Sequence, residues 1–122
     1  MGPVDWTAVI AGWGVAALLG AAFYGRAAVP RSNLALHALA ALLLFVSMAM
    51  IGHMFARVGA ATLQAKPWLY FMMAGGLAST FIGPAVLINA VRRERALGPA
   101  LFDAAYWLVA FLAAGAVFWL LG

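Results

Sequence analysis

Apolar residues fill four long stretches of the chain, and short polar connections separate them. The stretches cover residues 6–25, 33–56, 67–91 and 99–121. Each is long enough to cross a hydrocarbon core about 30 Å thick as a helix. The pattern therefore predicts an all-α fold, an integral membrane four-helix transmembrane bundle, with a single membrane domain over residues 1–122.

Prolines mark the starts of the predicted helices. Pro30, Pro67 and Pro99 lie at the beginning of the second, third and fourth stretches, where the missing N–H of a proline is tolerated. Within the third stretch, Gly83-Pro84 removes a backbone donor and predicts a kink. Such a kink is either a hinge that lines a cavity or an ordinary bend in a packed helix.

The composition of the chain excludes most soluble functions. Hydrophobic residues make up 68% and charged residues 8%, so the domain must use lipid as its solvent. The first stretch lacks a preceding Lys or Arg, and we expect it to be a retained span rather than a signal peptide. Cysteine is absent, which excludes disulfides, thiolate metal sites and cysteine nucleophiles.

The basic residues indicate an orientation. The first and third connections hold five of them and the middle connection two, so the positive-inside bias places both termini outside the cytoplasm, in one fixed orientation. The Ala-, Gly- and Arg-rich composition favours a bacterial cytoplasmic (inner) membrane, and short basic loops without stacking aromatics do not predict nucleic-acid binding. The basic residues are Arg26, Arg31, Arg92, Arg93 and Arg95 in the first and third connections and Arg57 and Lys66 in the middle connection.

Small residues recur at every fourth position in two of the stretches. Such spacing lets two helices approach backbone to backbone in lipid, where dispersion replaces the hydrophobic effect. We therefore expect the first and third spans to be buried in the bundle or at a subunit contact. The helix-packing residues are Gly12, Ala16 and Gly20 in the first span and Gly75, Ser79 and Gly83 in the third.

Ionisable groups inside spans are the default functional candidates, because each is costly in lipid unless it is paired or solvated. His37 and His53 are 16 residues apart in the second stretch, about 24 Å along a helix and nearly opposite in direction, so they cannot share one metal ion. Each could separately bind a haem or chlorophyll-type pigment, with His53 the better candidate; a hydrogen-bonded histidine near the membrane surface is the alternative. We expect no resident cofactor and no metal site.

Asp103 lies early in the fourth span. Its side chain can reach the arginines of the third connection, and such a contact would explain an acidic residue inside a span. Asn89, Tyr106 and His37 are expected at a similar depth and could bind a polar headgroup, but the set lacks a nucleophile paired with a base. The sequence therefore predicts no catalytic residue and no enzyme activity.

Both ends of the chain resemble a known family. The resemblance rests on the opening residues 5–10, on Phe23-Tyr24-Gly25, and on residues 101–109 with Gly115. With these motifs the chain resembles the bacterial family of small four-helix membrane proteins called domain of unknown function 1761. It departs from the family after Gly25, where Arg26 replaces a Gly-Lys continuation. The resemblance implies the four-helix membrane fold and no activity.

Three functions are compatible with the sequence. The first is a non-enzymatic packing or accessory subunit of a larger membrane complex or homo-oligomer, with membrane lipids and other subunits or further copies as partners. The second is a small-solute or ion pathway formed by an oligomer. The third is a subunit that holds a pigment or haem through His53. The polar lining of a pathway would consist of Ser79, Thr80, Asn89, Asp103 and Tyr106.

Overall fold

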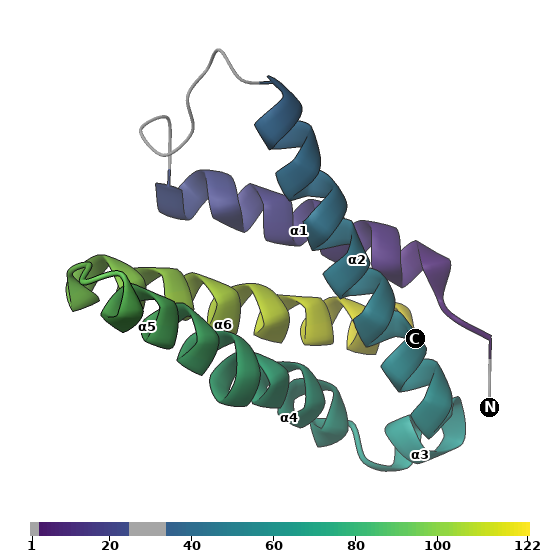
Figure 1. Ribbon diagram of the computed structural model, residues 1–122. Coiled ribbons are helices and arrows are strands. Elements are labelled where there is room, and N and C mark those ends of the chain that lie inside the picture. The colour runs from purple at the N-terminus through teal and green to yellow at the C-terminus, as the bar shows by residue number, and fades with distance from the viewer. Residues whose placement is uncertain (1–2, 25–33) are drawn as a thin grey trace.

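The computed structural model describes residues 3–24 and 34–122, and this part of the chain forms helices without a strand (Figure 1). Arg26, Pro30 and Arg31 lie outside the described residues. The helices are α1 Trp6–Tyr24, α2 Leu34–Val58, α3 Ala60–Ala65, α4 Trp68–Leu77, the π-helix η1 Ala78–Ile82, α5 Gly83–Arg92 and α6 Leu97–Leu121.

Four helical segments of the described chain are long and apolar enough to cross a membrane. They are α1, α2, the continuous run Trp68–Arg92 made by α4, η1 and α5, and α6. The prediction of an all-α four-helix bundle is confirmed, and the protein is a multi-pass membrane protein. Pro67 directly precedes α4 and Pro99 lies in the first turn of α6, where neither proline removes a helical hydrogen bond.

Helix α6 lies at the centre of the bundle. It packs against α1 on one side and against α4, η1 and α5 on the other, while α2 packs on α1 (Figure 1). The helices thus follow one another in an open row rather than a closed ring. Both ends of the described chain and the short helix α3 lie at one end of the bundle, and the turn between α5 and α6 lies at the other (Figure 1).

Glycine allows a close helix contact between α6 and α4. A Cβ atom at Gly115 would lie 2.8 Å from the backbone oxygen of Tyr70, closer than real Cβ contacts. Around this contact the core is filled by aromatic and aliphatic side chains. Phe118 is buried and its ring meets that of Phe55 edge-on, with centroids 5.1 Å apart. This contact joins the ends of α2 and α6.

The third span is irregular near the position of the predicted kink, and the irregular turn precedes the proline. Pro84 lacks an N–H, and the backbone widens over Ala78–Ile82 into a π-helical turn, in which the N–H of Gly83 bonds to the oxygen of Ala78. A wider turn relieves the contact between a proline ring and the preceding turn. The short helix α3 within the middle connection was not predicted, because six residues carry too few repeats to show a period.

Candidate functional site

Helix α2 carries an inward stripe of apolar residues at alternating spacings of three and four. Leu44, Met48, Ile51 and Phe55 are buried on this side. The sulfur of Met48 lies 3.6 Å from the position that a Cβ of Gly12 in α1 would occupy. The inward stripe therefore attaches the C-terminal half of α2 to α1 and to the end of α6.

A second stripe with the same spacing runs along the other side of α2. At about 100° per residue, its direction differs from that of the inward stripe by about 130°. All five side chains are large and apolar, and their exposed fractions lie between 50% and 66%. We call these residues the outward stripe: Leu36, Leu39, Leu43, Val46 and Met50.

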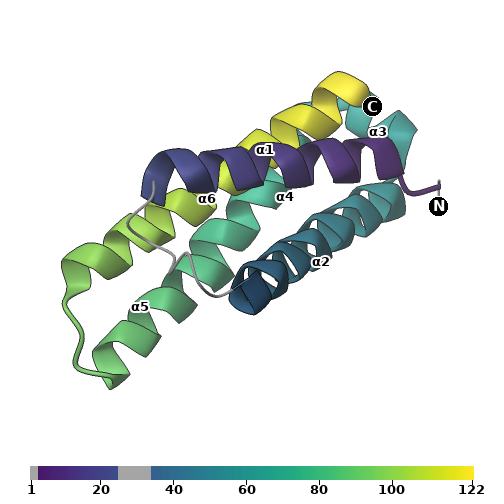
Figure 2. The ribbon, with the colours of Figure 1, turned by 90° about the horizontal axis from the view of Figure 1, so that it is seen from above.

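The N-terminal half of α2 leaves the bundle. Trp13 of α1 donates a hydrogen bond from Nε1 to the backbone oxygen of Ala41, 3.0 Å away, and its ring meets that of Phe45. Before this anchor, residues 34–40 are all exposed. Figure 2 shows this end of α2 separated from α5 and α6. A crevice of about 590 Å³ opens between α1, α2 and α6 as a result.

The polar residues expected at one depth fall on two sides of α6. His37 and Tyr106 line the crevice, whereas Asn89 and Asp103 line a pocket between α5 and α6. The hydroxyl of Tyr24 donates a hydrogen bond to Oδ1 of Asp103 and so links the two sides. The sequence places Asp103 within reach of the arginines of the third connection, and Arg93 and Arg95 line the same pocket. Its hydrogen-bond partner is Tyr24 of α1.

The remaining residues of the expected polar lining bond to nearby backbone. Ser79 and Thr80 both donate to the backbone oxygen of Gly76, one helical turn earlier. The hydroxyl of Tyr106 donates to the backbone oxygen of Ala16, 2.9 Å away. A single copy of the chain, in the part that the structure describes, does not bring the five lining residues to one passage.

The two histidines lie on different sides of α2, as their spacing predicts. Nδ1 of His53 lies 2.7 Å from the backbone oxygen of Ala49, and its exposed ring meets Trp6 edge-on. With Nδ1 bound to a carbonyl, Nε2 is the nitrogen that can take a ligand. The described residues hold no group of three or more His, Asp or Glu side chains suited to a metal ion.

The small-residue faces are used mainly inside the chain. Gly12 and Ala16 are buried in α1, and a Cβ at Gly20 would lie 3.2 Å from the hydroxyl of Tyr106. Gly75 and Gly83 are buried as well, against α6 and the π-helical turn, whereas Ser79 is exposed. A surface for a partner must therefore be sought elsewhere, and the outward stripe is the candidate. Its spacing is visible in the sequence, whereas the spacing of small residues pointed to the first and third spans.

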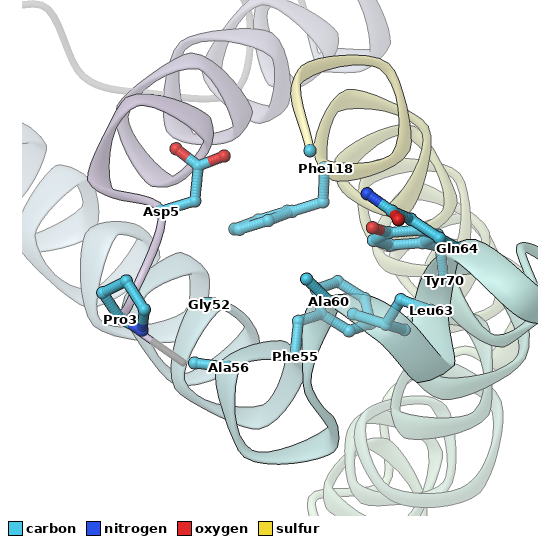
Figure 3. A pocket seen from close by; sticks show the side chains of 11 residues that line it. Pro3, Asp5, Gly52, Phe55, Ala56, Ala60, Leu63, Gln64, Tyr70 and Phe118 are labelled. Atoms are coloured by element: carbon cyan, nitrogen blue, oxygen red, sulfur yellow. The ribbon is translucent and has the colours of Figure 1, made fainter. Parts of the chain in front are cut away.

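A further pocket lies at the end of the bundle that holds α3. Its volume is about 210 Å³, and Asp5 and Gln64 stand on opposite sides of the ring of Phe118 (Figure 3). Oδ1 of Asp5 accepts a hydrogen bond from the N–H of Ala8, 3.0 Å away, and so caps α1. The pocket is mainly apolar and holds no paired acid and base.

Comparisons with protein-family models, curated proteins and solved structures gave no match to this chain. The resemblance to domain of unknown function 1761 therefore stays a prediction.

Proposed function

We propose that the protein is a non-enzymatic helix-packing subunit of the membrane that associates with a second copy of itself through the outward stripe of α2. The observation that carries this proposal is the regular spacing of large exposed side chains on the side of α2 that its own bundle leaves uncovered. A stripe with alternating steps of three and four is the pattern by which two helices interlock with a small left-handed crossing angle.

If all copies are inserted in the membrane in one orientation, the geometry supports a second copy as the partner of the outward stripe. Copies inserted the same way are parallel, so α2 of one copy meets α2 of the other about a twofold axis along the membrane normal. One stripe is then complementary to itself. The exposed N-terminal half of α2 also stands clear of α5 and α6 (Figure 2).

We further propose a cytoplasmic-membrane location with both termini outside the cytoplasm. Besides the uneven basic residues, the placement of tryptophans supports this orientation. Trp6, Trp68 and Trp119 are all exposed, and they belong to helix ends at the α3 end of the bundle. Tryptophan is enriched at membrane interfaces.

Single-cysteine cross-linking in native membranes tests the association directly, because the chain has no cysteine of its own. Leu39→Cys and Val46→Cys place one thiol on the outward stripe. Ala38→Cys is the matched control, since it is exposed, precedes Leu39 and points about 100° away. A disulfide requires Cα atoms within about 7 Å, so a twofold contact should cross-link the stripe variants on mild oxidation and leave the control monomeric.

Equal cross-linking of all three variants would reveal random collision, and absence of cross-linking at both stripe positions would reject the twofold contact. Cross-linking of the stripe to a different protein would identify an accessory subunit of a larger complex. The solute pathway and the pigment holder stay alternatives; neither gains a specific contact from the described residues.

A further inference from the structure

We infer that the turn between α5 and α6 forms a binding site for the phosphate of an anionic membrane lipid. The pocket at this turn has a volume of about 440 Å³. Arg93, Arg95 and Asn89 are among the residues that line it. Arginine presents several N–H groups in a planar fork, which suits phosphate oxygens.

The backbone of the turn holds the two arginines in a defined arrangement. The N–H of Arg95 bonds to the oxygen of Ala90 at 2.9 Å, and the N–H of Glu94 bonds to the oxygen of Val91 at 3.1 Å. Glu94 has a φ of 53°, in the left-handed region. These features make a Schellman motif, a tight and recurrent end to a helix. The arginines are therefore presented by a hydrogen-bonded turn.

The start of α6 adds to the positive character of the pocket. Ala96 precedes the helix in an extended conformation without a side-chain cap, and the first turn holds no acidic residue. Ala96, Pro99 and Ala100 line the pocket. The N-terminal N–H groups of a helix favour an anion, and here they lie beside the two arginines.

Asp103 is the carboxylate in the pocket, and its charge opposes that of the arginines. Its Oδ1 already accepts a hydrogen bond from Tyr24 of α1. Glu94 belongs to the turn but is not among the lining residues. Two guanidinium groups against one carboxylate leave the lining with a net positive charge.

The position of the turn favours a lipid over a free anion. The turn joins the ends of two helical segments of membrane length, Trp68–Arg92 and Leu97–Leu121. The ends of membrane-spanning helices lie at the level of the lipid headgroups. A phosphate held by Arg93 and Arg95 would therefore lie at the depth of a headgroup phosphate.

Native mass spectrometry of the full chain in mild detergent tests this inference, with phosphatidylglycerol as the anionic probe and phosphatidylcholine as the neutral one. We expect one phosphatidylglycerol to be retained in preference to phosphatidylcholine. A basic residue near an anionic surface contributes about 1 kcal/mol, so loss of each contact should weaken retention about fivefold. Arg93→Gln and Arg95→Gln should each have this effect.

Arg92→Gln is the matched control, because Arg92 belongs to the same basic run but is not among the lining residues. It removes the same charge and should leave retention close to the wild-type value. An equal loss in all three variants would overturn the site in favour of diffuse attraction. Equal retention of the two lipids, or full displacement by millimolar inorganic phosphate, would also overturn it, the latter in favour of a free-anion site.

Discussion

Tyr24, the last residue of α1, donates its hydroxyl hydrogen bond to Asp103 in α6, 79 residues further along the chain. The bond lies at the end of the contact between α1 and α6. The ring of Tyr24 also meets that of Tyr106 edge-on, with centroids 5.4 Å apart. An acidic side chain inside a span thus has a hydrogen-bond partner on the neighbouring helix.

Loss of this bond should destabilise the contact between α1 and α6. We expect Tyr24→Phe to lower the free energy of unfolding by about 0.6–1.7 kcal/mol, the range found for hydrogen bonds between membrane helices. Unfolding by sodium dodecyl sulfate in mixed micelles measures this change. In the double variant with Asp103→Ala the two effects should not add, because both remove the same bond. Additive effects would show that the pair is not coupled.

Close contact at Gly115 predicts a strong effect of one methyl group. Gly115→Ala should destabilise the bundle by about 1–3 kcal/mol, because its Cβ would lie 2.8 Å from the backbone oxygen of Tyr70, which cannot rotate away. Gly76→Ala is the control, since a Cβ there meets nothing within 4 Å. Thermal unfolding in detergent compares the two, and equal stability would mean that α4 and α6 do not touch at this point.

Helix α1 offers a second test of internal packing. Gly12→Leu should prevent stable folding, because the Cβ position already touches Met48, Ala114 and Phe118 at 3.6–3.9 Å and has no room for a larger side chain. Gly14→Leu should be tolerated, since nothing lies within 4 Å of its Cβ. The yield of monodisperse protein on size-exclusion chromatography separates these outcomes. A well-folded Gly12→Leu protein would contradict the packing described for α1.

Replacement of Glu94, in the turn after α5, by glycine should stabilise the protein. Glu94 has a φ of 53°, where an L side chain is disfavoured. We expect Glu94→Gly to raise the free energy of unfolding by about 0.5–1 kcal/mol. Arg92→Gly, within the last turn of α5, should lower it by a similar amount. Mixed-micelle unfolding measures both changes, and a loss of stability in Glu94→Gly would contradict the left-handed turn.

The proposed orientation predicts the compartment of the C-terminus. Alkaline phosphatase fused after Gly122 should be active in a bacterial host, because the enzyme requires the oxidising side of the membrane for its disulfides. A green fluorescent protein fusion at the same residue should be dark when exported through the general secretion pathway. The opposite pair of signals would place the C-terminus in the cytoplasm.

The sequence alone was sufficient to predict that the helices lie in lipid and how many of them span the membrane. Four apolar stretches of membrane length, with prolines at their starts, require helices in lipid, because unpaired backbone groups cannot be tolerated there. An irregular turn near Pro84 was also predictable from the missing N–H. For the candidate site, the spacing of Leu36, Leu39, Leu43, Val46 and Met50 is present in the sequence.

Tertiary structure alone decided which faces of these helices turn inward. Lipid tails are as apolar as the neighbouring helices, so hydrophobicity does not distinguish the two sides of α2, and only the fit of side chains does. The sequence placed Asp103 within reach of arginines close along the chain, whereas only the folded chain brings Tyr24 to its side chain. The exposure of the outward stripe follows from the angle at which α2 leaves the bundle, which depends on the contacts of Trp13, Met48 and Phe55.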